Sequence, residues 1–188
     1  MPEATEVNEY TATITLTEPV TERDHIAGPD NAPATLVVYG DYQCEDTGAA
    51  HRIICEVRER LGDKMRLVFR NYPITKTHEY AEEAAEAAEA AGGQGKFWEM
   101  HDFLFHHQDA LDHNSLMEYA EEIGLDLEQF EKDLDRRTYA PRIIEDIVSG
   151  KHSGVDQTPT LFINGVRHDG VLDADSLEKA IELAAESF

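Results

Sequence analysis

Cys44 stands where a predominantly apolar run, 34–39, gives way through a short loop to a segment with helical periodicity, 45–61. The first run is typical of a buried strand. At the start of a helix the first backbone N–H groups lack internal partners, and the helix dipole is positive there. Both effects stabilise a thiolate and make its sulfur nucleophilic. We therefore expect Cys44 to act as a nucleophile toward disulfides.

No second cysteine lies close enough to complete an internal disulfide with Cys44. Thr47 occupies the position three residues on, where its hydroxyl could reach back toward the sulfur. A hydroxyl cannot resolve a mixed disulfide. Cys55 is eleven residues along the same helix, displaced by roughly 16 Å, whereas a disulfide needs Cα atoms within about 7 Å. We expect Cys55 to be a small buried apolar side chain.

Glu45 and Asp46 fill the first turn of the expected helix. Negative side chains stabilise a helix start through its dipole. The same charges oppose formation of a thiolate beside them, so the two effects on Cys44 compete. We also place Glu45 and Asp46 among the residues that meet a substrate.

Four segments, in order, resemble the DsbA-like proteins, which are thioredoxin-fold disulfide oxidoreductases with a Cys-x-x-Cys motif. These segments are Tyr39–Cys44, Phe69–Pro73, Ala87–Ala91 together with Gly95–His101, and Gly154–Gly165. The resemblance spans roughly Asp24 to Leu183, which is most of the chain. The departure from the family is the sequence Cys-Glu-Asp-Thr at 44–47, which holds one thiol instead of two.

The resemblance also implies a role for Thr158 and Pro159. In the family, the residue before a cis-proline lies against the active-site sulfur, and Thr158 matches that residue. Most X-Pro bonds are trans, but here the resemblance favours cis. Backbone groups exposed beside such a bond can pair with an extended substrate. We therefore assign Thr158 and Pro159 to substrate positioning.

The remaining pattern predicts an α/β protein with a thioredoxin-like fold and an inserted helical subdomain. We divide the chain into an N-terminal extension with one possible strand (1–23), a thioredoxin core (24–75 and 139–188) and a helical insertion (76–138). The expected strands are 11–16, 34–39, 65–69, 160–163 and 166–168, the last two joined by an Asn164–Gly165 turn. The expected helices are 45–61, 79–91 ending at Gly92–Gly93, 97–107, 115–123, 127–134, one that starts at Arg137 or Tyr139 and runs to Lys151, and 175–186.

We assign no catalytic role to several other acidic and histidine side chains. The glutamates of the Ala-rich helix, Glu82, Glu83, Glu86 and Glu89, are expected mainly on a solvated face. His101, His106 and His107 do not share a helix face as i, i+4 ligands would, so we predict no zinc site. His152 and His168 flank the Thr158–Pro159 segment, although histidine is most often a surface residue. We expect no bound metal or cofactor.

Composition limits the classes of partner. The chain has 188 residues, 41% of them hydrophobic, and a formal net charge of −23 with only 16 Lys and Arg. Such acidity argues against binding to a phosphate backbone, so nucleic acid is not an expected partner. No run is long enough to span a bilayer and the first residues do not resemble a signal peptide. We expect a cytoplasmic protein without membrane contacts, or an exported one if a leader was removed, and leave its oligomeric state open.

Three functions fit these residues. The first is a monothiol oxidoreductase, in which Cys44 attacks a protein or small-molecule disulfide and an external thiol such as glutathione releases the adduct. The second is a glutathione-using transferase or isomerase whose pocket is covered by the helical insertion. The third is a non-catalytic module that binds a peptide or partner. We favour the first because the nucleophile is retained.

Overall fold

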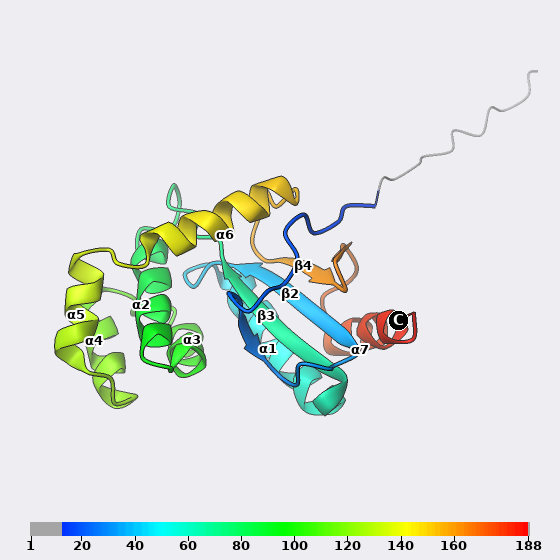
Figure 1. Cartoon of the computed structure of the whole chain (residues 1–188), viewed down its shortest axis with the longest axis horizontal. Helices are drawn as coiled ribbons and strands as arrows, with labels where there is room; N and C mark the ends of the chain where they lie inside the picture. Colours follow the sequence, from blue (N-terminus) through cyan, green and yellow to red (C-terminus); the bar gives the residue numbers. More distant parts are fainter. Residues whose placement is uncertain (1–12, 188) are drawn as a thin grey trace, which may run out of the picture.

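A five-stranded mixed sheet forms the centre of the computed structural model, which describes residues 13–187 (Figure 1). The strand order is β1-β3-β2-β4-β5, and only the central pair β2 and β3 is parallel. Their bounds are β1 His25–Ala27, β2 Ala34–Gly40, β3 Met65–Asn71, β4 Thr160–Ile163 and β5 Val166–His168. The centre is occupied by the two strands with nearly continuous apolar sequences, as expected for strands that are buried on both faces.

Helices cover both faces of the sheet because alternate side chains of β2 point to opposite sides. Leu36 and Val38 belong to a large core with side chains of α1 (Glu45–Leu61) and α7 (Ala174–Ala185). Val37 and Tyr39 belong to a smaller core on the opposite face. There α6 (Ala140–His152) approaches closely, with Ser149 bonded to the Tyr39 hydroxyl at 2.8 Å.

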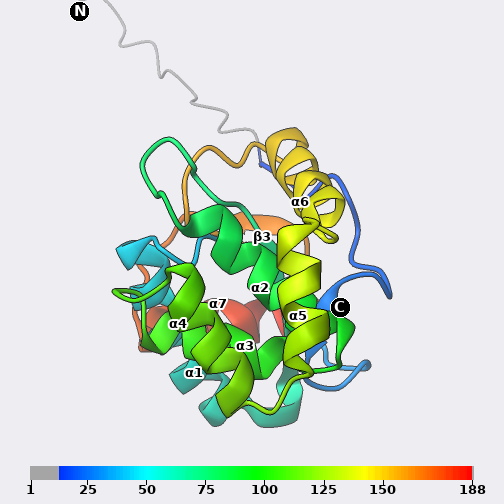
Figure 2. The ribbon, with the colours of Figure 1, turned by 90° about the vertical axis from the view of Figure 1, so that its left-hand side faces the viewer.

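The segment between β3 and α6 forms a group of helices beside the sheet, which faces the viewer in Figure 2. Its members are α2 (Ala81–Gly93), α3 (Phe97–His106), α4 (His113–Glu122) and α5 (Leu127–Asp135). A single turn of 3-10 helix, η1 (Gly62–Lys64), joins α1 to β3. From β2 onward the elements follow the predicted order of helices and strands, and α3 packs against α1, the helix that Cys44 precedes.

Several boundaries differ from the sequence-based prediction. Strand β1 was not predicted, since three residues are too few for a clear alternating pattern. Of the expected strand 11–16, residues 11 and 12 lie outside the described part, and the rest contributes only an isolated bridge between Thr15 and Val166. Helix α2 continues through Gly92 and Gly93 instead of breaking before them.

The prediction for the glutamates of α2 was wrong at two positions. Glu86 and Glu89 are 5% and 2% exposed. Glu89 binds three partners, namely His25 (2.8 Å), Asn71 (2.7 Å) and Arg142 (3.0 Å). The reason is that α2 is packed between other elements, so the side of the helix opposite the alanines also lies against protein.

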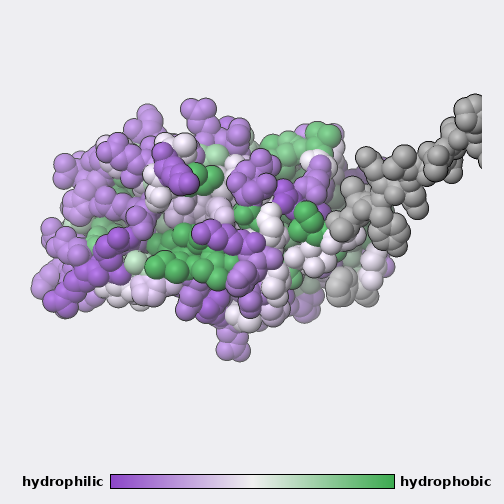
Figure 3. Space-filling model, turned by 90° about the horizontal axis from the view of Figure 1, so that it is seen from above, coloured by the Kyte–Doolittle hydropathy of each residue, from purple (hydrophilic) through white to green (hydrophobic). Residues whose placement is uncertain are grey.

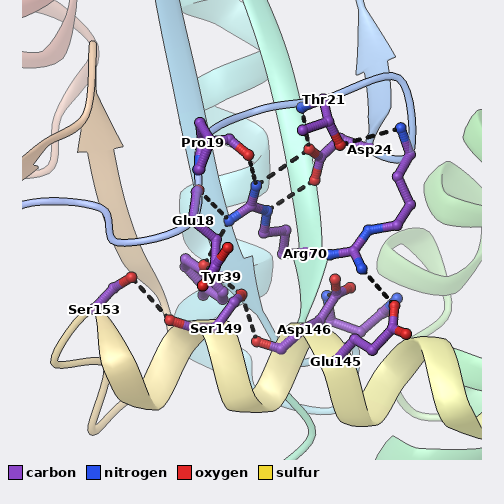
Figure 4. A network of polar contacts seen from close by, with 12 residues as sticks. Glu18, Pro19, Thr21, Asp24, Tyr39, Arg70, Glu145, Asp146, Ser149 and Ser153 are labelled. Atoms are coloured by element: carbon purple, nitrogen blue, oxygen red, sulfur yellow. Dashed lines mark hydrogen bonds and ion pairs between the residues drawn. The ribbon is translucent and has the colours of Figure 1, made fainter.

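A buried ion pair ties the N-terminal segment to the sheet (Figure 4). Arg70 on β3 is 1% exposed and binds the carboxylate of Asp24 through Nε (2.8 Å) and Nη2 (3.1 Å). The guanidinium also donates to the carbonyls of Glu18 and Pro19 and to the hydroxyl of Tyr39. These bonds satisfy the arginine donors, as a buried charge requires.

Hydrophilic side chains cover much of the face seen from above, with apolar patches between them (Figure 3). Among the exposed apolar residues are Ile144 and Val148 of α6. Across residues 13–187, each helix is too short or too polar to cross a lipid bilayer.

Candidate active site around Cys44

Cys44 is the N-cap residue of α1, reached from β2 through the loop 41–43. Its backbone N–H donates to the Asp41 carbonyl (3.1 Å), and its own carbonyl accepts from Gly48 N–H (3.0 Å), which begins the helix. No side chain caps this helix start. The residue is 8% exposed, so protein atoms cover most of it. The predicted location at the strand-to-helix junction is therefore correct.

The sulfur of Cys44 lies against the loop that precedes β4. Its Sγ–H donates to the carbonyl of Thr158 over 3.4 Å, although the two residues are 114 positions apart. The Thr158–Pro159 peptide bond is cis. The structure thus brings together Cys44, Thr158 and Pro159, as the resemblance implied.

The expected hydrogen bond from Thr47 to the sulfur is not formed. Thr47 is 1% exposed, and its Oγ1 accepts instead from the backbone N–H of Asp41 at 3.5 Å. The helix turns Thr47 inward toward the end of β2, where the main chain of the loop offers a donor. Its role in this structure is to hold the loop before Cys44.

Glu45 and Asp46 are both exposed in the first turn of α1. Asp46 lines a groove of about 400 Å³ that runs beside Thr158 and Pro159, whereas Glu45 is not among its lining residues. The two acidic residues therefore have different relations to the groove, and the expectation of substrate contact fits Asp46 better.

Two residues that line the groove each hold a buried polar atom with no hydrogen-bond partner among the described residues. These atoms are Oγ1 of Thr158 and Nε2 of His168. Ile53 and Leu172 contribute apolar side chains to the same groove. A buried polar atom without a partner costs free energy. His152, the other histidine near this segment in sequence, is exposed.

Gln108, which the sequence did not single out, supports the loop around Cys44. Its Nε2 donates to the carbonyls of Tyr42 (2.7 Å) and Cys44 (2.9 Å). The amide fits there because Gly48 has no side chain: an added Cβ would lie 1.9 Å from Gln108 Oε1. A glutamine 64 positions from Cys44 carries no local sequence signal for this contact.

Asp41 fixes the other side of the same loop. One carboxylate oxygen accepts from Gln43 N–H (2.8 Å), and the other meets Ile74 N–H (2.7 Å) and His78 Nδ1 (2.8 Å). The carboxylate is buried and joins the end of β2 to the chain that leaves β3. The approach to Cys44 is thus held by side chains from several parts of the chain.

Cys55 differs from its predicted environment. It is half-buried and free, and its Sγ lies 3.6 Å from Nε2 of His51, one helical turn back. Burial raises the pKa of its thiol. His101 is buried and its Nδ1 meets the Tyr42 hydroxyl at 3.0 Å, while His106 and His107 each turn Nδ1 to a carbonyl of their own helix.

Comparison with known proteins agrees with this arrangement. A family model described as Thioredoxin matches residues 20–183. A curated relative, the Na(+)/H(+) antiporter NhaA 1 of Salinispora arenicola, is 47% identical over 165 residues, which is 87% of this chain and 25% of the relative. The chain therefore spans about a quarter of the length of that relative.

Solved structures match over nearly the whole chain. BdbD from Bacillus subtilis in its oxidised form gives a TM-score of 0.81 at 22% identity, covering 93% of this chain and 98% of that one. A thioredoxin-like oxidoreductase from Silicibacter pomeroyi gives 0.78 at 25% identity, covering 88% and 94%. The α-DsbA1 protein of Wolbachia pipientis gives 0.76 at 19% identity, covering 92% and 95%. The predicted thioredoxin-like α/β fold and its DsbA-like form are confirmed.

Proposed function

The chain belongs to the thioredoxin family, and on that premise we propose that it is a monothiol oxidoreductase that works through Cys44. The thiolate of Cys44 attacks a disulfide formed between a substrate and glutathione. The substrate thiolate leaves, and Cys44 carries the glutathione as a mixed disulfide. A second glutathione thiolate then attacks this adduct, which restores the Cys44 thiolate and releases oxidised glutathione. The substrate disulfide is reduced, and two glutathione moieties leave as one disulfide.

The observation that carries the proposal is the contact between Cys44 Sγ and the Thr158 carbonyl at 3.4 Å. Thr158 itself also lines the open groove. The carbonyl oxygen has two lone pairs, so it can also accept from a backbone N–H of an extended substrate, in the manner of an added strand. A substrate paired in this way would lie beside the Cys44 sulfur.

We propose a single-thiol mechanism because no other cysteine lies close enough to Cys44 to form a disulfide with it. Thr47 holds the position of a resolving cysteine, and Cys55 lies in the middle of α1, roughly 16 Å along the helix from Cys44. That separation exceeds the roughly 7 Å between Cα atoms that a disulfide permits. An external thiol is therefore needed to release the adduct.

The test is to treat the reduced protein with oxidised glutathione and to map the adduct by mass spectrometry. We expect one glutathione on Cys44 and no disulfide between Cys44 and Cys55. Turnover of a glutathionylated peptide should require added glutathione and disappear in Cys44→Ser. Cys55→Ser is the matched control and should keep the activity. An internal disulfide in the folded protein, or turnover that survives Cys44→Ser, would contradict the proposal.

The same experiments separate two other functions of the groove. Saturable glutathione binding and transfer to an electrophile by Cys44→Ser would favour a glutathione transferase or isomerase, in which the sulfur is dispensable. Binding of an extended peptide without any adduct on Cys44 would favour a non-catalytic module. The contact of the Cys44 sulfur with the Thr158 carbonyl supports thiol exchange over both.

A further inference from the structure

We propose that His51, His101 and Asp102, with Cys55 as fourth ligand, form a binding site for a divalent transition metal, zinc above all. The ligand atoms of His51, His101 and Asp102 all lie within 4.8 Å of one another. The first histidine comes from α1, and the other two residues are neighbours on α3. The site would join the helix that begins at Cys44 to the helical group beside the sheet.

The measured separations fit tetrahedral coordination. Zinc bound to nitrogen or oxygen at about 2.0–2.2 Å and to sulfur at about 2.3 Å places adjacent ligand atoms roughly 3.3–3.6 Å apart. Nε2 of His51 is 3.6 Å from Oδ1 of Asp102 and 3.6 Å from Sγ of Cys55. Two edges of the tetrahedron are therefore already close to their final length. Side-chain movements on the order of 1 Å complete the set.

Helix geometry explains why these residues meet. His51 and Cys55 are separated by four positions on α1, so they lie on one face of that helix. His101 and Asp102 face them from α3, where the ring of His101 packs edge-on against that of His51 with centroids 5.1 Å apart. The sequence-based search considered His101 only with His106 and His107 on its own helix. The ligands come instead from two helices, and that pairing is decided by packing.

Burial favours the neutral form of both histidine rings. It lowers the pKa of His51 to about 4 and holds the pKa of His101 well below its ordinary value. The neutral ring is the form that ligates a metal. The Tyr42 hydroxyl at Nδ1 of His101 orients this ring and leaves Nε2 for a metal. Such a supporting hydrogen bond is a usual feature of metal-binding histidines.

The charges around the cluster and its exposure allow a cation to enter. The side chain of Asp102 is 56% exposed, whereas His51 and His101 are 9% and 2% exposed, so the open side is at the carboxylate. Asp102 and Glu99 bring negative charge that attracts a cation. Positive charge near the cluster comes from Arg52, Arg58 and His106 and repels a cation. A bound metal must also displace the proton of Cys55, whose pKa burial raises. Binding should accordingly strengthen as pH rises.

The test is a zinc titration of the reduced, chelator-treated protein against a chromogenic competitor. We expect one zinc per chain. His51→Gln and Asp102→Asn should each weaken binding by about tenfold or more, because each removes one ligand. His107→Gln and Asp109→Asn are matched controls on exposed residues nearby, and Cys44→Ser excludes the active-site sulfur as a ligand. All three should bind zinc as the unchanged chain does.

Cobalt gives a second readout that does not depend on the affinity. In the unchanged chain we expect the visible bands of a tetrahedral ion together with a thiolate-to-cobalt charge-transfer band that Cys55→Ser removes. Circular dichroism of the metal-free variants verifies that they are folded. Absence of zinc binding by the folded chain, or equal binding by His51→Gln, overturns the site. A charge-transfer band unchanged in Cys55→Ser overturns the fourth ligand.

Discussion

At the scale of single residues, the loop that presents Cys44 depends on a position with no side chain, which leaves room for another residue to pack there. Gly48 and Gln108 form the sharpest example, because the glutamine occupies the volume that a Cβ on Gly48 would fill. Its two hydrogen bonds to the carbonyls of Tyr42 and Cys44 hold the loop that presents the sulfur. The absence of a side chain at Gly48 thus has a structural purpose beyond the start of the helix.

Gly48→Ala should therefore change the free energy of unfolding differently with and without Gln108. Alanine favours a helix over glycine by about 1 kcal/mol, so Gly48→Ala should stabilise a Gln108→Ala protein by roughly that amount. In the unchanged protein the new methyl displaces Gln108 from two hydrogen bonds, each contributing about 0.5–1.5 kcal/mol, so the substitution should destabilise or be neutral. Urea unfolding of the four proteins measures the coupling. Equal effects in both backgrounds would refute the contact.

Thr47→Cys should supply the missing resolving thiol. Positions three apart on a helix have Cβ atoms roughly 5–6 Å apart, which a disulfide with Cys44 can bridge after a small adjustment. We expect reduction of insulin to rise by on the order of tenfold, because the mixed disulfide can then resolve internally. Thr47→Ser is the control and should show no gain. An inactive Thr47→Cys with an intact fold would favour the binding-module interpretation.

At the scale of secondary-structure elements, a carboxyl group with a raised pKa lies where α6 packs against β3. Asp146 of α6 is 1% exposed and accepts from Asn71 N–H at 2.9 Å. Burial, with Glu89 adding to its effect, raises the pKa of Asp146 from 3.8 to about 7, against the opposing charges of Arg142 and Arg70. The docking of α6 on the sheet is therefore sensitive to pH.

The sign of that sensitivity follows from the two pKa values. Between about pH 4 and pH 7 the unfolded chain has lost the proton of Asp146, whereas the folded chain retains it. The contribution of this group to the free energy of unfolding therefore falls as pH rises, by at most about 1.4 kcal/mol per pH unit. It becomes constant above pH 7.

Asp146→Asn should remove this contribution, since an amide keeps an acceptor for Asn71 N–H but carries no titrating proton. The free energy of unfolding of Asp146→Asn relative to the unchanged chain should rise across this window, as measured by urea unfolding at a series of pH values. Asp135→Asn, which neutralises an exposed carboxylate, is the control for the loss of one charge. A constant difference between Asp146→Asn and the unchanged chain across this window would contradict the raised pKa.

At the scale of the whole molecule, the formal charge of −23 places many like charges on a small surface. Their mutual repulsion destabilises a compact state. Salt shortens the distance over which they act, from about 30 Å at 0.01 M to about 3 Å at 1 M. The acidity of the chain therefore makes the stability of the fold dependent on salt.

We expect the thermal midpoint to rise with sodium chloride over that range. The matched comparison is the triple variant Glu118→Gln, Glu121→Gln and Glu122→Gln, three exposed residues of α4 that form no ion pair with described residues. Its midpoint should be higher at low salt and should rise less with added salt. Identical slopes for the two proteins would show that these carboxylates do not contribute to the repulsion.

Much of the fold could be predicted from the sequence because local residue patterns encode it. The helix after Cys44 has the predicted bounds, Glu45–Leu61, since its apolar residues repeat at helical spacing and Gly62 ends it. The Asn164–Gly165 turn joins β4 and β5 as predicted, with positive φ at both residues. Strand β1 was missed because its three residues gain their place only by pairing with β3.

The sequence by itself determined the position of the nucleophile, the lack of a second thiol near it, and the order of helices and strands from β2 onward. These features depend on residues that are neighbours in the chain. Only the tertiary structure decided what surrounds them. In the folded chain, Thr47 bonds to the loop and not to the sulfur, and Gln108 bonds to the carbonyl of Cys44. Glu86 and Glu89 are buried, and His51 lies next to His101. These contacts join residues from different elements, and the packing of those elements selects one arrangement of side chains that no local pattern encodes.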